Sequence, residues 1–251
     1  MSKERKNIIM HSFTGLVILI MVAFSSARNG SRKVEDVAID IKQEHGNYFT
    51  DQFEVKNLMT LEETDYILGS ELSDFNPKTL EERVEVNPFI SDAQIYRDLK
   101  GNVKVNVTQS RPIARIFSRK NTDTYIDSEG NILPVNARHT ARVPLIELEK
   151  SFSWGTNLNE TSYGQDVLAL LQFIESDPFW KAQIAHLILK KNGEVELLPQ
   201  VTKQRVLLGY PEELEKKFKK LMIFYRQILP AKGWNSYDMV SLKYENQIVC
   251  K

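Results

Sequence analysis

The sequence predicts an α+β protein in which a single N-terminal transmembrane helix precedes a small α/β domain and a larger mixed β-sheet domain with flanking helices. Three observations predict this fold class: an uncharged apolar run near the start, two alternating apolar strands around residue 100, and short apolar runs beyond residue 112 with an amphipathic helix among them. The expected tail, transmembrane helix and two domains are residues 1–7, 8–27, 33–111 and 112–251.

The transmembrane helix is predicted because the run from Asn7 to Ala27 contains no Asp, Glu, Lys or Arg. At about 1.5 Å per residue this run just crosses a hydrocarbon core of about 30 Å. The alternative is a cleaved signal peptide, since basic residues precede the run and the residues from Ser25 to Ala27 are small. The length of the run favours an anchor over a signal core of about 7 to 15 residues. Basic residues flank the run equally, so charge alone leaves its orientation open.

The first domain is expected to contain a strand, two helices and a hairpin. The strand lies near Val34 to Ile41, and the first helix runs from about Asp51 to Met59. The second helix is predicted from Pro77 to Val86, because Asn76 can cap it and proline suits the first helical position. The expected buried stripe of this helix is Leu80, Val84 and Val86.

The hairpin of this domain is expected between Asn87 and Arg115. The segment from Asp98 to Asn102 makes the turn, and Gly101 can adopt the positive φ that such a reversal needs. Apolar residues at period two place one face of both strands in the core. These core residues are Ile90, Ala93, Ile95, Val103, Val105 and Val107.

The second domain is expected to be rich in strands. An apolar stripe between Val167 and Ile174 predicts a helix, which Asp177 and Pro178 end. The pair Asn192-Gly193 is a strong signal for a hairpin turn. The predicted strands are residues 112–117, 124–127, 132–133, 143–148, 185–190, 194–198 and 205–208, and two more between 239 and 250.

The clearest helix is expected from Pro211 to Leu229, where apolar residues recur every three or four positions. Glu212 and Glu213 lie near its start, where the helix dipole favours negative charge. The lysines on its other side are expected to form a solvated face, and contact with acidic lipid is the alternative. These lysines are Lys216, Lys217, Lys219 and Lys220.

Composition and motifs exclude several classes of function. The 33 basic and 33 acidic residues balance, which argues against nucleic-acid binding. A single cysteine, Cys250, excludes an internal disulfide and a Cys-rich metal site. The acidic residues Asp123, Asp127 and Glu129 lack the twelfth-position glutamate of an EF-hand loop, so no metal is expected. The sequence contains no familiar catalytic or phosphate-binding motif, so we expect neither an enzyme nor a cofactor.

The hairpin region carries a specific pattern, namely an NPxVxxAxVxR run, a G-x-hydrophobic-x-hydrophobic strand and an RxPIA exit. It resembles the end of a POTRA domain, and the chain is similar to the FtsQ/DivIB family of bacterial cell-division proteins. The matching residues are Asn87, Pro88, Phe89, Ile90, Ala93, Ile95, Arg97, Gly101, Val103, Val105, Arg111, Pro112, Ile113 and Ala114. The segment from Met239 to Cys250 resembles the last strands of the family, with Lys243 in place of the usual arginine and Ser241 in place of the usual aspartate.

The resemblance implies a non-enzymatic membrane scaffold of the divisome that binds small coiled-coil proteins of the FtsB and FtsL type. It also implies β-augmentation, in which a partner strand pairs with the last strand of the sheet. The two domains are expected to face the periplasm from the cytoplasmic (inner) membrane, and the protein is expected to be enriched at the division septum. The domain junction is expected at Arg111 and Pro112. The expected partner-binding residues are Leu242, Lys243, Tyr244, Asn246, Ile248 and Val249.

Two other functions fit parts of the sequence. POTRA domains also occur in proteins of polypeptide transport and outer-membrane assembly, but those usually carry several POTRA repeats, which this sequence lacks. An exterior hydrolase could use an acidic pair such as Asp127 and Glu129, although their spacing does not favour one.

We predict that residues 8–27 stay in the mature protein and hold it in the membrane, because the run is uncharged and long enough to cross the bilayer. Membrane fractions washed with high salt and with alkali should retain the chain, whereas a peripheral protein would be released. Mass spectrometry of the purified protein checks the same point. A mature amino terminus at Arg28 would show that the segment is a signal peptide.

Overall fold

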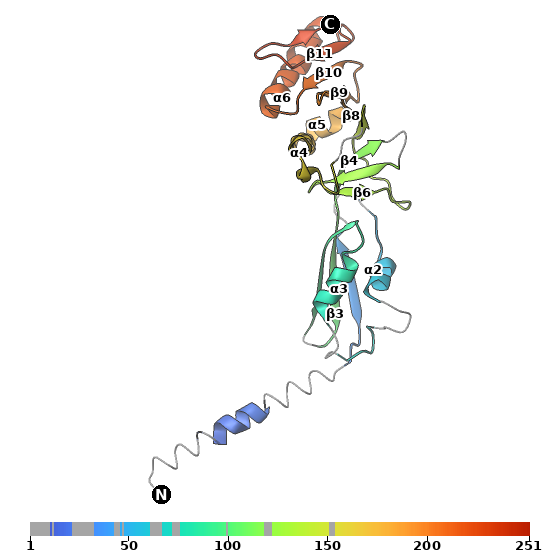
Figure 1. Cartoon of the computed structure of the whole chain (residues 1–251), viewed down its shortest axis with the longest axis vertical. Helices are drawn as coiled ribbons and strands as arrows, with labels where there is room; N and C mark the ends of the chain where they lie inside the picture. Colours follow the sequence, from blue (N-terminus) through green and yellow to red (C-terminus); the bar gives the residue numbers. More distant parts are fainter. Residues whose placement is uncertain are drawn as a thin grey trace. The chain divides into compact units, whose positions relative to one another are not determined.

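The computed structural model describes most of the chain and arranges it as two compact units (Figure 1). The first unit is drawn from residues 1–44 and 50–109, and the second from residues 45–49 and 110–251. The described residues are 11, 13–21, 33–42, 46, 48–60, 67–71, 76–98, 100–117, 122–150 and 154–251.

The expected transmembrane helix lies partly outside the described residues. Within residues 8–27, His11 and residues 13–21 are described, and they are helical. Across the described part of the chain, no helix combines the length and the apolar character that a membrane span requires.

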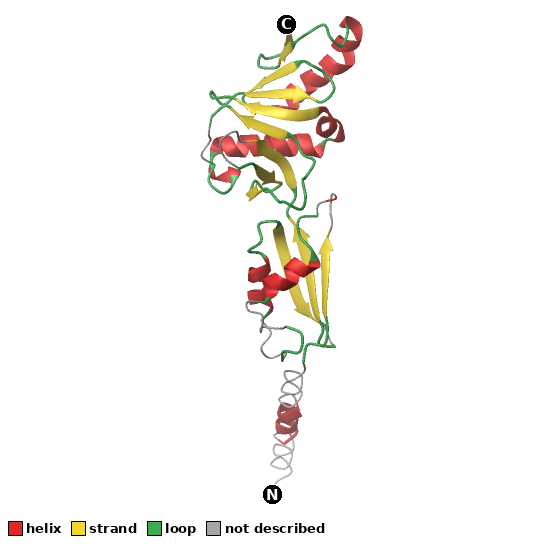
Figure 2. Cartoon of the chain, turned by 90° about the vertical axis from the view of Figure 1, so that its right-hand side faces the viewer, coloured by secondary structure: helices red, strands yellow, loops and turns green. Residues whose placement is uncertain are grey.

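The first unit contains a three-stranded sheet with the strand order β1-β3-β2. Strand β1 runs parallel to β3, and β2 pairs with β3 in the antiparallel direction. Helices α2 and α3 cover this sheet (Figure 2), and their apolar residues pack with its buried face. The elements are β1 (Val37–Lys42), α2 (Gln52–Met59), α3 (Pro77–Val84), β2 (Ile90–Arg97) and β3 (Val103–Gln109).

Helix α3 is shorter than the sequence predicts. It ends at Val84, and the side chain of Asn76 makes no hydrogen bond that caps its start. Leu80 and Val84 are buried as expected, but Val86 is 76% exposed. The expectation that Val86 is buried was therefore wrong, because the helix has ended and residue 86 lies in a turn.

The core face of the hairpin depends on a β-bulge. The spacing from Ile90 to Ala93 is odd, so a regular strand would point these two side chains to opposite faces. The register shifts between Ile90 and Asp92, and this bulge returns both apolar side chains to the buried face. Gly101 has a φ of 95°, which confirms its expected role in the turn.

The second unit contains a nine-stranded mixed sheet with the order β12-β11-β10-β9-β8-β7-β4-β5-β6. Helices α4, α5 and α6 pack against it, and their apolar side chains form one core with those of the strands. The strands are β4 (Pro112–Phe117), β5 (Thr124–Asp127), β6 (Ile132–Pro134), β7 (Leu145–Leu148), β8 (Ile184–Leu189), β9 (Val195–Pro199), β10 (Arg205–Gly209), β11 (Met239–Ser241) and β12 (Val249–Cys250). The main helices are α4 (Ser162–Ser176), α5 (Pro178–Gln183) and α6 (Leu214–Ile223).

Two helical features differ from the expectation. Asp177 ends α4 as predicted, but its side chain also accepts hydrogen bonds from the amides of Phe179 and Trp180 and so caps the unpredicted helix α5. The long helix expected from Pro211 begins only at Leu214. It continues after α6 through a π-helical turn, Phe224–Ile228, and a final α-helical turn, α7 (Leu229–Lys232).

We predict that Val84→Ala and Val86→Ala differ clearly in their effect on stability. Val84 is fully buried, so its truncation should lower the free energy of unfolding by about 2 kcal/mol through lost burial and a residual cavity. Val86 is exposed, and the same truncation there should change it by less than about 0.5 kcal/mol. Urea unfolding of both variants measures the difference, and equal effects would contradict this placement of the two valines.

Candidate functional site

The outer edge of the nine-stranded sheet is formed by β12. It pairs with β11 in the antiparallel direction, with Val240 opposite Cys250 and Ser241 opposite Val249. Met239 and Lys251 exchange two backbone hydrogen bonds, of 3.1 and 2.9 Å. In an antiparallel ladder such hydrogen-bonded pairs alternate with pairs whose amides and carbonyls point away from each other. The backbone groups of Cys250 therefore point outward, away from β11.

The opposite edge of this sheet, β6, is covered. The amide of Ile132 donates to the carbonyl of Thr156 at 2.9 Å, and Asn131 forms a β-bridge with Asn157. In the described part of the chain, no strand lies beyond β12 and no hydrogen bond occupies the outward groups of Cys250. An uncovered strand edge can pair with a strand of another chain.

Lysine side chains hold the segment between β11 and β12. The Nζ atom of Lys220, on α6, donates to the carbonyls of Leu242 and Tyr244, both at 2.7 Å. The amide of Leu242 donates to the carbonyl of Leu207 on β10 at 2.9 Å. These contacts fix the start of the segment against the helix and the sheet, so β12 can return along β11.

Lys243 forms an ion pair with Glu194 in the turn between β8 and β9. The hydrogen bond from Lys243 holds the pKa of Glu194 below its usual value, and the same bond raises the pKa of Lys243. Gly209 lies close beneath this lysine: a Cβ atom there would be 3.0 Å from its Cγ atom, and the φ of +78° also favours glycine. Lys243 is therefore engaged within its own chain.

The six expected partner-binding residues have different surroundings. Leu242 is buried in the core, and Ile248 is partly buried against it. Asn246 has a φ of 54° and makes the turn between the two strands. Tyr244 and Val249 are the members with exposed apolar side chains, at 53% and 44% exposure.

The lysines of α6 do not form the purely solvated face that the sequence predicts. Lys217 is buried, and its Nζ atom donates to the carbonyl of Tyr210 at 2.7 Å. Burial lowers the pKa of Lys217. Lys220 contacts the 242–244 segment, whereas Lys216 pairs with Glu213 at the surface. Sequence reasoning missed the roles of Lys217 and Lys220, because carbonyl partners leave no pattern in the side chains.

The expected junction residues lie at the start of β4. Arg111 forms an ion pair with Glu175, which also accepts a hydrogen bond from Lys181 at 2.6 Å. The backbone carbonyl of Arg111 accepts from the amide of Ser128 at 2.9 Å. Pro112 begins β4 and pairs with Asp127 on β5. These contacts all lie within the second unit.

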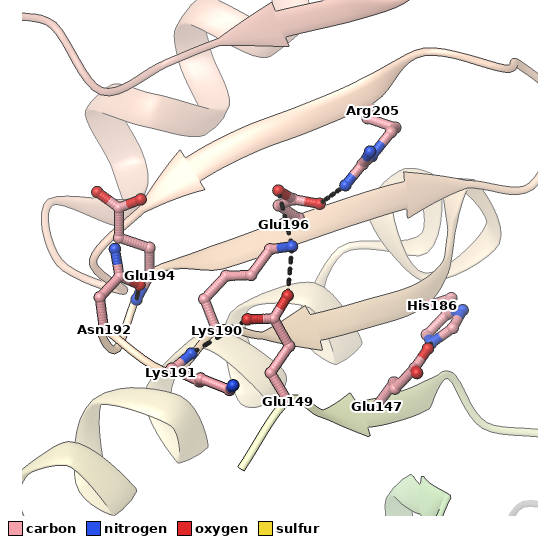
Figure 3. Close-up of polar contacts among 9 residues, drawn as sticks. All are labelled: Glu147, Glu149, His186, Lys190, Lys191, Asn192, Glu194, Glu196 and Arg205. Atoms are coloured by element: carbon pink, nitrogen blue, oxygen red, sulfur yellow. Dashed lines mark hydrogen bonds and ion pairs between the residues drawn. The ribbon is translucent and has the colours of Figure 1, made fainter.

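A network of charged residues runs from the ends of β7 and β8 across β9 to β10 (Figure 3). Lys190 lies between Glu149, at 2.8 Å, and Glu196, at 3.1 Å, and Glu196 also pairs with Arg205. The hydrogen bond between Lys190 and Glu149 raises the pKa of the lysine and lowers that of the carboxyl. Because each charge in this chain of contacts has an opposite neighbour, the network joins adjacent strands and offers little unbalanced charge to a ligand.

The acidic residues of the 123–129 segment have protein partners. Asp127 accepts hydrogen bonds from the amides of Glu129 and Asn131, at 2.9 and 2.8 Å, and so closes the turn between β5 and β6. Asp123 pairs with Arg115 at 2.7 Å. Within the described ranges, no group of three or more His, Cys, Asp or Glu residues is arranged to hold a metal ion.

Comparison with known proteins finds two family models along the chain. Residues 32–108 match a POTRA-like domain, and residues 111–251 match the family described as FtsQ/DivIB, C-terminal related. A curated relative, the cell division protein FtsQ of Rhodothermus marinus, is 24% identical over 188 residues. That similarity covers 73% of this chain and 68% of the relative.

We predict that Lys220→Met loosens the 242–250 segment without unfolding the second unit. The variant loses two hydrogen bonds from a charged donor to carbonyl oxygens, so the free energy of opening this segment should fall by about 1 to 2 kcal/mol. Hydrogen–deuterium exchange of the amides in the 242–250 segment measures this change in free energy. Lys219→Met is the matched control because Lys219 is exposed on the same helix. Equal exchange in the two variants would rule out this role for Lys220.

Proposed function

We propose that this chain, which belongs to the FtsQ/DivIB, C-terminal related family of cell-division proteins, is a non-enzymatic scaffold of the bacterial division machinery. The uncharged run at residues 8–27 supports a place in the cytoplasmic membrane. In this proposal, domains at 33–111 and 112–251 meet at Arg111 and Pro112, face the periplasm and gather at the division septum. The chain then acts by holding other membrane proteins at that site.

The observation that carries the proposal is the outward backbone of Cys250 on β12, an edge strand that no described residue covers. We propose that a partner adds a strand there, with its own amide and carbonyl paired to those of Cys250. The proposed partners are coiled-coil division proteins of the FtsB and FtsL type, in keeping with the family resemblance.

The side chains beside this edge would select the partner. A strand as short as β12 offers few backbone hydrogen bonds, so apolar contacts must supply much of the affinity. Tyr244 combines a large apolar ring with a polar tip, and Val249 adds a second exposed apolar contact. Lys243 is a positioning residue in this proposal, since its ammonium group pairs with Glu194 and holds the segment in place.

The cellular role is tested by replacing the native copy with fluorescent fusions in dividing cells. The full chain should gather at mid-cell and support division. A chain that lacks residues 246–251 should be folded and present in the membrane but should fail to recruit FtsB-like and FtsL-like partners. A truncated chain that binds these partners with unchanged affinity would exclude the edge-strand mechanism, even though its family membership would stand.

We predict that Cys250→Pro weakens partner binding about 10-fold, whereas Cys250→Ala leaves it within about 2-fold. Proline removes an amide that points away from β11, so the pairing within the sheet survives, but the partner loses a donor and meets the proline ring. Titration of the purified chain with an FtsB-like partner measures both variants. The amide of Lys251 donates to the carbonyl of Met239, so slow hydrogen exchange at this amide shows that β12 is still paired with β11. Equal affinities would place the binding site elsewhere.

A further inference from the structure

The outer edge of β2 in the first unit is already occupied by side chains from α3 and from the residue that follows its last turn. Strand β2 is the last strand of the three-stranded sheet. The amide of Ala93 donates to the Oε1 atom of Glu85 at 3.2 Å, and the amide of Ile95 donates to the Oε1 atom of Glu81 at 2.7 Å. These two amides therefore point away from β3, while those of the residues between and beside them face it.

The spacing of the carboxylates matches the spacing of the amides. Glu81 and Glu85 are four residues apart, which is about 6 Å along a helix. Ala93 and Ile95 are two residues apart, which is about 6.7 Å along a strand. Leu80 and Val84 directly precede the two glutamates and are buried against the sheet. The apolar stripe of α3 thus holds the helix where both carboxylates reach the edge of β2.

The other edge of the same sheet is covered in a similar way. The amide of Val103 donates to the carbonyl of Asp36 at 2.9 Å, so alternate residues of β1 face outward. The outward carbonyl of Ile39 accepts a hydrogen bond from the side chain of Gln52, the first residue of α2, at 2.8 Å. Side chains from both helices therefore occupy backbone groups that a further strand would need.

We infer that Glu81 and Glu85 form an edge lock that prevents β2 from pairing with β2 of a second copy of this chain. An antiparallel pair centred on Gln94 would match Ala93 of one copy with Ile95 of the other, and it would use the two amides that the carboxylates now hold. Such pairing must first break two hydrogen bonds to ionised acceptors on each copy. The edge lock thus closes β2 to strand addition.

The first test measures the exchange of single amides in the full chain. In the double variant E81A/E85A, the amides of Ala93 and Ile95 should exchange at least 10-fold faster, because their acceptors are gone. The amides of Gln94 and Tyr96, which face β3, should be unchanged, and this shows that the sheet remains folded. Unchanged exchange at Ala93 and Ile95 would overturn the proposal.

Two control variants separate the lock from a general effect of charge on α3. E81Q/E85Q keeps a carbonyl acceptor at each position and should preserve slow exchange at Ala93 and Ile95. E82A removes an exposed carboxylate from the same helix and should also leave both amides protected. Fast exchange of the Ala93 and Ile95 amides in E82A would contradict a lock made by these two acceptors. The same holds if these amides exchange as fast in E81Q/E85Q as in E81A/E85A.

The second test detects the β2–β2 pair itself. Gln94 is exposed and lies at the centre of the proposed pair, where two opposed Cα atoms come within reach of a disulfide. In a Cys250→Ala background, Gln94→Cys should form a cross-linked dimer under oxidation only when E81A/E85A is also present. The lock hypothesis fails if E81A/E85A gives no cross-linked dimer, or if the chain with both glutamates intact cross-links equally well.

Discussion

The structure depends on how the backbone groups at the edges of its two sheets are satisfied. An edge strand presents unpaired amides and carbonyls that pair readily with another strand. Gln52 covers a carbonyl of β1, Glu81 and Glu85 cover amides of β2, and the carbonyl of Thr156 covers an amide of β6. Strand β12 has no such cover among the described residues, which makes it the edge suited to a partner.

The open edge is held in place by contacts on its inner side. Lys220 ties the 242–244 segment to α6, and Lys243 ties it to Glu194. In the proposed complex, a partner strand would meet an ordered template and would not have to order the segment as it binds, which would reduce the entropy lost on association. Buried Leu242 adds to this order, since it joins the start of the segment to the core.

The candidate site was only partly predictable. The alternation near Ile248 and Val249 and the family resemblance indicated a last strand at a sheet edge, and β12 lies there. The family resemblance suggested that Lys243 faces a partner, and the charge pattern suggested that Lys220 faces solvent, whereas both contact their own chain. Lys220 contacts two backbone carbonyls and Lys243 contacts Glu194, which is far away in sequence, and neither kind of partner can be read from local spacing.

The sequence by itself determined most strands, the turn at Gly101, the starts of α2 and α3, and the family. It could do so because period-two alternation, glycine turns and prolines at a first helical turn depend only on a few neighbouring residues. Tertiary structure alone decided the bulge that buries both Ile90 and Ala93, and the exposure of Val86. It also decided which edges are closed, since the reach of Glu81 and Glu85 to β2 depends on where the core places α3. These features arise from packing between segments distant in the chain, which no local pattern records.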